Sequence, residues 1–278
     1  MNDRKEFNRR QTLPRIKRAL IASTLGGVLA LTSGCSAVDK PNSFTFIPDF
    51  PPDFKYELKA IYLPAAGETC RVPGKPDFWV SFNKPTMEYV STAEIELYKT
   101  VSDCPLALNK VEIKVIGFYG KGRSNFSMDY ASIFVRPELL ERLKGTFNED
   151  GAGEFYGECM WSFRTVGPHR SLIKLLTCKK MDAQGNVLRT RPSTAYTLTQ
   201  LEGKTVTLKV GLSEEEKPAW GDTWAEVPGG WKRCMGEKFE DQHAYCNGNY
   251  KDFSTFRMVD GRVCTIYPGC TEKWETKP

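Results

Sequence analysis

Apolar and polar residues alternate with a period of two along much of the middle of the chain. The alternating runs lie at 56–62, 78–82, 95–97, 111–115 and 206–212. This period places apolar side chains on one face of a strand and charged side chains on the other. Strands that are solvated on one face usually pair in an antiparallel manner. The pattern therefore predicts a mainly β protein with antiparallel, sandwich-like sheets.

One segment has a helical pattern. Pro137 stands where a first turn would begin, Leu139, Leu140 and Leu143 form an apolar stripe, and Gly145 follows as a stop signal. We predict one short helix there. No repeat of fixed period runs through the chain, which argues against solenoids and propellers.

The composition changes after residue 212. Residues 218–278 hold ten aromatic residues and four cysteines but no leucine. Such a segment cannot build an ordinary aliphatic core, so aromatic residues and disulfides must hold it together, or it must pack on the larger domain. We predict four segments along the chain: a signal peptide at 1–34, an anchor and linker at 35–54, a β-rich domain at 55–212, and a small disulfide-stapled C-terminal module at 213–278.

The net charge separates the N-terminus from the rest of the chain. The 278 residues include 39 Lys and Arg and 34 Asp and Glu, which gives a net charge of +5. Residues 1–34 hold seven of these cations and two of these anions, so 32 of each sign remain. Nucleic-acid binding needs a clustered excess of Lys and Arg, so we expect no nucleic-acid partner.

The first forty residues have the pattern of an export signal. Residues 1–18 are polar and basic, residues 19–31 form an apolar run, and small residues then precede Cys35. The apolar run is too short to span a bilayer as a stable helix. This segment resembles the lipobox of bacterial lipoproteins, although Thr32 stands where that family prefers leucine. An ordinary secretory signal that happens to contain a cysteine is the alternative.

The lipobox resemblance implies that Cys35 is acylated and becomes the first residue of the mature chain. In that family Asp after the cysteine retains the protein at the inner membrane, so Ser36 implies the periplasmic face of the outer membrane. Several acyl chains are sufficient for stable anchoring. Outer-membrane lipid is therefore the first expected partner, reached through Cys35.

The nine cysteines fit an exported, oxidised protein. With Cys35 acylated, an even number remains, and in an exported chain this predicts four disulfides. The cysteines concerned are Cys70, Cys104, Cys159, Cys178, Cys234, Cys246, Cys264 and Cys270. No CxxC pair occurs and the two histidines lack ligand spacing, so neither a metal nor another cofactor is expected.

One disulfide follows from hairpin geometry. A turn sequence at 167–169 separates two strand-like segments. In a symmetric hairpin centred on this turn, Cys159 lies opposite Cys178, and Trp161 lies opposite Leu176 on the same face. We predict the Cys159–Cys178 disulfide and leave the other pairings open.

The sequence contains none of the common catalytic motifs. It has no G-x-S-x-G, H-E-x-x-H, phosphate-loop or dinucleotide motif. The histidines are His169, in the predicted turn, and His243, in the C-terminal module. Neither belongs to a pattern that would supply a base to a nucleophile, so we assign no catalytic residue and expect a protein that is not an enzyme.

Candidate partner-binding residues lie in the C-terminal module. Trp220, Trp224 and Trp231 occur among glycines and prolines, and Arg233 follows them. Interface energy concentrates in Trp, Tyr and Arg, so we predict that these four residues contact a protein partner. The alternative is that the tryptophans form the core of a module without leucine. The acidic run at 214–216 is either a contact for a basic partner or a solvated linker.

Two functions of different classes fit these features. The first is a lipid-anchored periplasmic protein that neutralises a protein partner by covering its active site. The lipobox, the β pattern and the hairpin between Cys159 and Cys178 resemble periplasmic immunity lipoproteins over about residues 55–212. That resemblance implies a secreted effector of a type VI secretion system, often a phospholipase, as the partner. The second is an envelope-associated lipoprotein that binds carbohydrate or maintains the cell envelope, with the tryptophans converging on a groove.

Overall fold

Three β-sheets account for most of the fold. The computed structural model describes residues 41–73, 80–85 and 92–272. The sheets contain eight, six and four strands, and helices are short. The prediction of a mainly β protein with one short helix and a disulfide-bonded C-terminal region is confirmed.

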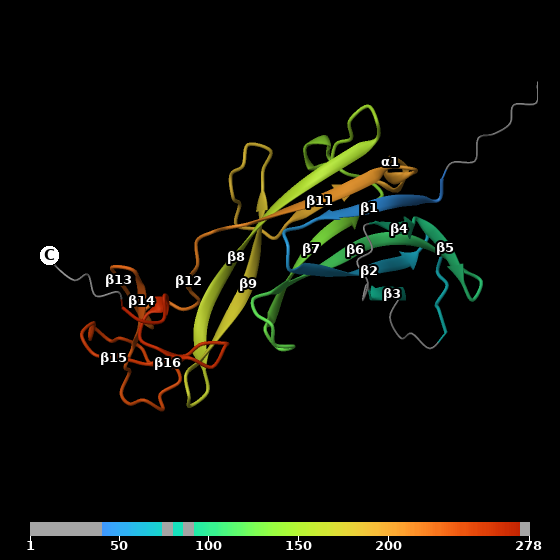
Figure 1. Ribbon diagram of the computed structural model, residues 1–278. Coiled ribbons are helices and arrows are strands. Elements are labelled where there is room, and N and C mark those ends of the chain that lie inside the picture. Colours follow the sequence, from blue (N-terminus) through green and yellow to red (C-terminus); the bar gives the residue numbers. More distant parts are fainter. Residues whose placement is uncertain (1–40, 74–79, 86–91, 273–278) are drawn as a thin grey trace, which may run out of the picture. The chain divides into compact units, whose positions relative to one another are not determined.

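The largest sheet is built around the antiparallel pair β8 and β9. Its strand order is β17-β16-β9-β8-β11-β1-β4, and β12 also pairs with β8. Figure 1 shows β11 beside β8 and β1 on the other side of β11. The strands are β1 (Ser43–Asp49), β4 (Ala93–Glu96), β8 (Ala152–Val166), β9 (Ser171–Met181), β11 (Thr205–Leu212), β12 (Lys217–Pro218), β16 (Phe256–Arg257) and β17 (Val263–Cys264).

The other two sheets have six and four strands. The six-stranded sheet has the order β10-β7-β6-β2-β3, with β5 also paired to β6. Its strands are β2 (Phe54–Pro64), β3 (Val80–Pro85), β5 (Tyr98–Val101), β6 (Cys104–Phe118), β7 (Phe126–Val135) and β10 (Ser193–Tyr196). The four-stranded sheet consists of β13 (Trp224–Val227), β14 (Gly230–Cys234), β15 (Phe253–Ser254) and β18 (Tyr267–Pro268).

The two larger sheets pack face to face over one hydrophobic core. Alternation along β2, β6 and β11 turns every second side chain inward, and these inner residues are buried. Ring contacts join the sheets: the centroids of Phe46 on β1 and Tyr56 on β2 are 5.9 Å apart, and those of Phe54 on β2 and Trp161 on β8 are 6.4 Å apart. Burial of these apolar surfaces is the main favourable contribution to folding.

The direction of β11 differs from the sequence-based expectation. β11 lies between β1 and β8 and runs parallel to both, whereas β8 and β9 are antiparallel as expected. A parallel neighbour requires a long crossover connection, and here the chain passes through β10 and a helical turn between β9 and β11. The period of two identifies the apolar face of a strand, but it does not determine the direction of the neighbouring strand.

Strand β1 lies inside the segment that was predicted to be a linker. Phe44 and Phe46 are buried, and β1 is hydrogen-bonded between β11 and β4. The prediction of a linker over 35–54 is therefore wrong for residues 43–49. The prolines of this segment suggested a linker, but Phe44 and Phe46 already alternate with polar residues as in a strand. The predicted signal peptide at 1–34 and Cys35 lie outside the described residues.

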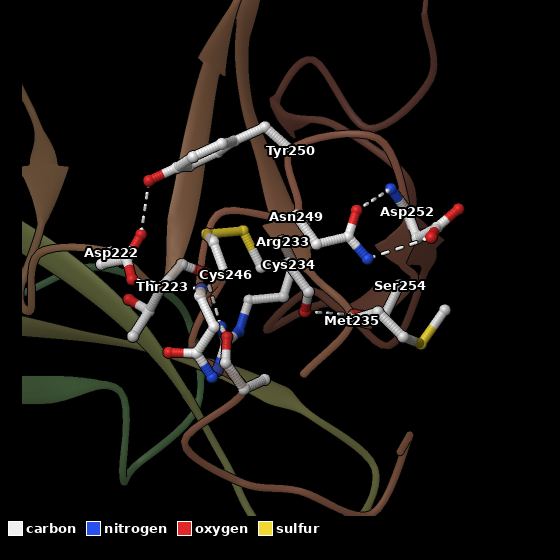
Figure 2. The surroundings of a disulfide bond; sticks show 12 residues. Asp222, Thr223, Arg233, Cys234, Met235, Cys246, Asn249, Tyr250, Asp252 and Ser254 are labelled. Atoms are coloured by element: carbon white, nitrogen blue, oxygen red, sulfur yellow. Dashed lines mark hydrogen bonds between the residues drawn. A yellow bond between two sulfur atoms is a disulfide. The ribbon is translucent and has the colours of Figure 1, made fainter. Parts of the chain in front are cut away.

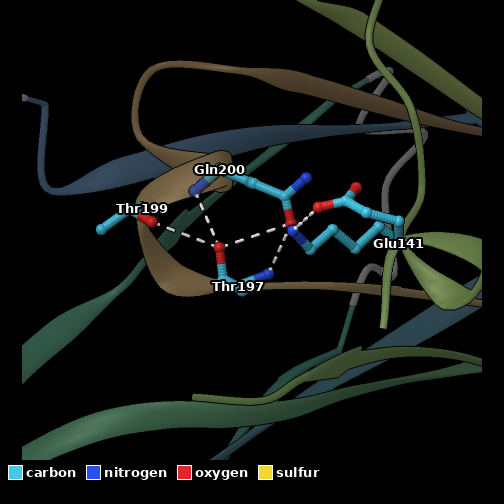
Figure 3. Close-up of polar contacts among 5 residues, drawn as sticks. Glu141, Thr197, Thr199 and Gln200 are labelled. Atoms are coloured by element: carbon cyan, nitrogen blue, oxygen red, sulfur yellow. Dashed lines mark hydrogen bonds and ion pairs between the residues drawn. The ribbon is translucent and has the colours of Figure 1, made fainter. Parts of the chain in front are cut away.

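The predicted helix near residue 140 is a single 3₁₀ turn, η1 (Glu141–Leu143). Leu140 and Leu143 are exposed, so the leucine stripe covers no apolar surface and gains no free energy from burial. The α-helical turn of the described chain is α1 (Leu198–Leu201). Figure 3 shows its capping box, in which the main-chain N–H of Thr197 donates to Oε1 of Gln200 at 2.9 Å. Neither turn is long and apolar enough to cross a membrane.

Four disulfides join the eight cysteines that were expected to be oxidised. Cys159 and Cys178 face each other on β8 and β9 with 3.9 Å between their Cα atoms, as the hairpin geometry predicted. The other pairs are Cys70–Cys104, Cys234–Cys246 and Cys264–Cys270.

The aromatic cluster of the C-terminal segment is centred on Phe163 of β8. The ring centroids of Trp224, Trp231 and Tyr267 lie 5.0, 6.1 and 4.3 Å from that of Phe163. Leu172 of β9 belongs to the same cluster. Both alternatives for this segment therefore apply: aromatic side chains and disulfides hold it together, and it also packs around the end of the β8–β9 hairpin.

Side chains of β7 cover the outer edge of β9. The main-chain N–H of Leu176 donates to the hydroxyl of Ser127 at 3.1 Å, and that of Cys178 donates to the carboxylate of Asp129 at 2.8 Å. Arg191 pairs with the other carboxylate oxygen at 2.7 Å. An uncovered strand edge would be open to pairing with another chain, so these contacts close β9 and join the two larger sheets.

Candidate functional site

Two arginine side chains are buried where the C-terminal segment meets the β8–β9 hairpin. Arg170 lies in the turn just before β9, and Arg233 lies on β14. Neither is accessible to solvent beyond a few per cent. A buried guanidinium is costly unless its donors are hydrogen-bonded, so the partners of these two groups define the local structure.

Arg170 donates to main-chain carbonyl oxygens of a single surface loop. Its Nη2 donates to the carbonyl oxygens of Met235 at 2.6 Å and Lys238 at 2.9 Å, and its Nε donates to that of Phe239 at 2.9 Å. A longer contact of 3.3 Å reaches the carbonyl oxygen of Asp241. The guanidinium also donates to the carbonyl of Cys234 and to the hydroxyl of Ser254.

Arg233 donates to the next part of the same loop. Its Nη2 donates to the carbonyl oxygens of Gln242 at 3.1 Å and His243 at 2.6 Å, and its Nη1 donates to that of Ala244 at 2.8 Å. Its Nε donates to the hydroxyl of Thr165 on β8 at 2.9 Å. Figure 2 shows Arg233 beside Thr223, to whose carbonyl oxygen its Nη1 also donates. We call residues 235–244 the arginine-held loop.

The electrostatics of the two groups are coupled. Burial, and next the positive charge of Arg170, lower the pKa of Arg233 to about 10. Burial also lowers the pKa of Arg170, and the carboxylate of Asp241 opposes this shift in both arginines. Both guanidiniums remain charged at neutral pH, and charge-assisted hydrogen bonds of this kind are stronger than neutral ones.

A disulfide and two further hydrogen bonds fix the end of the loop. Cys246 is bonded to Cys234 and donates its main-chain N–H to the carbonyl of Asp222 at 2.7 Å. The hydroxyl of Tyr250 donates to the carboxylate of Asp222 at 2.6 Å, as Figure 2 shows. The loop is therefore held at its end and along its backbone.

Because the loop carbonyls point toward the arginines, several of its side chains face solvent. Phe239 and His243 are exposed, and so is Tyr245, directly after the loop, with 44% of its surface accessible. A preordered loop loses little conformational entropy when a partner binds it. The arrangement is suited to presenting these side chains to another molecule.

A row of aromatic rings runs across this surface. The ring of His243 is 6.0 Å from that of Trp220 and 6.1 Å from that of Tyr245, and the latter pair is nearly parallel. Trp220 is 42% exposed, and the guanidinium of Arg164 lies 4.6 Å from its ring centroid. Within the described residues, the Nε of Arg164 has no hydrogen-bond partner. We call Trp220, His243 and Tyr245 the aromatic row.

The structure separates the residues that were predicted to bind a partner. Trp220 is on the surface, but Trp224 is buried and Trp231 is half-buried, both against Phe163. Arg233 is also buried, so its guanidinium is occupied by the loop. This corrects the expected surface of four residues: Trp224 and Trp231 form the core that leucine would otherwise supply, and Trp220 is retained.

Of the acidic run at 214–216, Glu216 makes contacts with other side chains of the protein. The carboxylate of Glu216 pairs with Lys174 on β9 at 2.6 Å and accepts a hydrogen bond from the hydroxyl of Tyr267. Burial, and next the hydrogen bond to Glu216, raise the pKa of Tyr267. Glu214 and Glu215 are exposed.

Sequence reasoning missed Arg170 and the arginine-held loop. An arginine after a turn resembles any solvated surface residue, so the sequence offers no sign that Arg170 is buried. A weak signal was available for the loop, because cysteines at 234 and 246 enclose a short polar stretch with aromatic residues.

Among the described residues, neither the cavity beside β2 nor the arrangement of possible metal ligands defines a site for a small ligand. A cavity of about 90 Å³ is lined by residues of β2, β4, β5 and β6, among them Tyr62 and Lys99. Typical small-molecule sites have volumes of roughly 300 Å³ or more. Within the described residues, no group of three or more His, Cys, Asp or Glu side chains is placed to hold a metal ion.

Comparisons with known proteins returned no relative. No protein-family model matches the chain, no curated protein matches its sequence, and no solved structure matches its fold.

Proposed function

We propose that this chain is a lipid-anchored protein of the periplasmic face of the outer membrane that neutralises a secreted protein by covering its active site. The proposed partner is a phospholipase delivered by type VI secretion. The observation that carries the proposal is the aromatic row beside the arginine-held loop. Its side chains are exposed, while the main chain at His243, in the middle of the row, is held by the buried guanidinium of Arg233.

The composition of this surface supports recognition of a protein. Interface hot spots are enriched in Trp, Tyr and Arg, and Trp220, Tyr245 and Arg164 supply these residue types around His243. The guanidinium of Arg164 lies 4.6 Å from the ring centroid of Trp220 and adds a positive charge beside the aromatic row. A rigid surface that combines aromatic contact area with a nearby positive charge is suited to tight, specific binding.

The proposed anchor supports the location. Acylation at Cys35 would keep the protein at the membrane surface, where a phospholipase must act. The four disulfides are consistent with an oxidising compartment outside the cytoplasm.

The central experiment measures capture of an effector. The mature chain carrying Cys35→Ser is mixed with the purified phospholipase effector encoded beside its gene. We expect a stoichiometric complex and loss of lipase activity. Trp220→Ala and Tyr245→Ala should each weaken the complex about thirtyfold, the effect of losing a hot spot of about 2 kcal/mol.

Tyr98→Ala is the matched control, because Tyr98 is as exposed as Trp220 but lies on β5. It should leave capture unchanged. Equal weakening by the Tyr98 and Trp220 variants would contradict the assigned surface. Absence of capture, together with Trp220-dependent binding to peptidoglycan or polysaccharide, would favour the carbohydrate-binding alternative.

The anchor is tested separately by fractionation. The wild-type protein should incorporate labelled palmitate and sediment with the outer membrane. Cys35→Ser should lose the label and enter the soluble periplasm. Retention of the label by this variant would contradict acylation at Cys35.

A further inference from the structure

A second surface lies at the end of the β6–β7 hairpin, on the outer face of the six-stranded sheet. Phe118 and Phe126 stand opposite each other on the two strands, with ring centroids 6.0 Å apart. Phe126 and Met128 occupy alternate positions on β7 and are 40% and 43% exposed. Apolar side chains of this size would ordinarily be buried, so their clustering at one tip requires an explanation.

Cations surround these apolar side chains. The ammonium of Lys55 lies 5.3 Å from the ring centroid of Phe118, and Lys121 and Arg123 are exposed in the connecting turn. The acidic residue Asp53 adjoins them, and its carbonyl oxygen accepts a hydrogen bond from Phe118. Cations therefore outnumber acids at the tip. We call Lys55, Phe118, Lys121, Arg123, Phe126 and Met128 the hairpin tip.

The charge at the tip contrasts with the rest of the same sheet face. Farther along, Lys114 pairs with Glu57 and Lys110 pairs with Glu112, each at 2.9 Å. Cations there are matched by acids, as on an ordinary solvated sheet. At the tip, by contrast, an excess of positive charge lies beside exposed apolar side chains.

The tip is positioned by the core of the protein. The ring of Tyr119 packs edge-on against Trp161 with centroids 5.4 Å apart. The same Trp161 lies over Gly117, where an added Cβ would come within 2.8 Å of the indole ring. The hairpin end is therefore held by a buried tryptophan.

We propose that the hairpin tip contacts the membrane surface and binds anionic phospholipid headgroups. Aromatic rings favour the headgroup region of a bilayer, and Lys and Arg near an anionic surface are attracted to its phosphates. Exposed Phe126 and Met128 would enter the boundary between headgroups and acyl chains.

The proposed lipid anchor identifies the membrane as the partner, and in this respect the inference rests on the proposed function. Eight residues lead from Cys35 to the start of β1 at Ser43, and a chain of that length spans at most about 28 Å. An acylated Cys35 would therefore keep the folded part of the chain next to the bilayer. A basic, apolar tip matches such a surface in charge and in polarity.

The test is co-sedimentation of the mature chain carrying Cys35→Ser with lipid vesicles. Vesicles of phosphatidylethanolamine with phosphatidylglycerol are compared with neutral phosphatidylcholine vesicles. We expect binding to the anionic vesicles that weakens as salt is added. The triple variant Lys55→Gln, Lys121→Gln and Arg123→Gln should lose about a hundredfold in affinity, since each cation near an anionic surface contributes about fivefold.

The matched control is Lys179→Gln, Arg189→Gln and Lys251→Gln, which removes the same charges from exposed positions elsewhere. It should bind within about threefold of the wild type. Phe126→Ser should weaken the binding that remains at high salt, where electrostatic attraction is screened. Equal losses in the two triple variants, or no preference for anionic vesicles, would overturn the proposal.

Effector capture by the same variants separates this inference from the proposed function. The hairpin-tip variants should capture the effector normally, because their residues are not part of the aromatic row. Normal capture without vesicle binding would overturn the membrane contact alone. Loss of capture specifically in the hairpin-tip variants would show that a protein binds there and would also overturn it.

Discussion

Arg170 and Arg233 bind successive stretches of the same loop. Arg170 donates to carbonyl oxygens at 235, 238, 239 and 241, and Arg233 donates to those at 242, 243 and 244. Two guanidiniums from distant parts of the sequence thereby hold a segment that has no regular secondary structure of its own. Rigidity at the proposed binding surface is a consequence of this arrangement.

Replacement of Arg233 by methionine should strongly destabilise the protein. Arg233→Met removes the donors of several buried hydrogen bonds and leaves their carbonyl acceptors unpaired, so we expect a loss of about 3 kcal/mol or more in the free energy of unfolding. Urea unfolding measures the change. Arg189→Met, at an exposed position, should stay within about 0.5 kcal/mol of the wild type. Similar effects in the two variants would argue against the structural role of Arg233.

Asp129 should be required for the closed edge of β9. Its carboxylate accepts from the main-chain N–H groups of Cys178 and Tyr130 and pairs with Arg191. Asp129→Asn replaces one acceptor oxygen by a donor, which would face an N–H or the guanidinium. We expect a loss of about 1–3 kcal/mol by thermal or urea unfolding, while the exposed variant Asp150→Asn should be neutral. Equal stability of both variants would show that this edge is maintained without Asp129.

Gly230 should not tolerate a side chain. Its φ is +144°, and a Cβ at this position would lie 1.9 Å from the carbonyl oxygen of Tyr267 on β18. Gly230→Ala must displace main-chain atoms between β14 and β18, so we expect a loss of about 3 kcal/mol or more. At Gly221 an added Cβ would meet no atom within 4 Å, so Gly221→Ala is the control. A folded Gly230→Ala protein with unchanged stability would contradict the close approach of these strands.

Acid should loosen the arginine-held loop. Hydrogen bonds from the main-chain N–H of Ala244, and then from that of His243, lower the pKa of Asp241 below its ordinary value of 3.8. The folded-state pKa is thus below the unfolded one, so the stabilisation is present above pH 3.8 and is lost as the pH falls through the folded-state pKa. Asp241→Asn should lose less stability than the wild type between pH 5 and pH 3.

The measurement is urea unfolding at these two pH values, with tryptophan fluorescence as the signal. Other carboxylates, including Asp182 and Asp260, also have lowered pKa values and contribute to the acid sensitivity of both proteins. The difference between the wild type and Asp241→Asn in the stability lost between pH 5 and pH 3 gives the contribution of Asp241. An identical pH dependence of the two proteins would exclude a contribution from Asp241.

The sequence by itself determined the features that depend on near neighbours in the chain. The period of two located five strands of the two larger sheets, β2, β3, β4, β6 and β11, since it reflects which face of each strand is apolar. The turn at 167–169 set the register of the hairpin, and the Cys159–Cys178 disulfide followed from it. A hairpin register is local, because one short turn fixes every pair along both strands.

The tertiary structure decided what depends on distant partners. β11 is parallel to β1 and β8 because the chain crosses over before it returns, and periodicity carries no information on that path. The leucines near residue 140 form a single 3₁₀ turn and not the predicted helix, because no apolar surface lies against them. Arg233 is buried and Trp220 is exposed, although an arginine is ordinarily the more exposed of these two residue types. Their positions depend on which groups the folded chain brings to them: loop carbonyls surround one side chain, and solvent reaches the other.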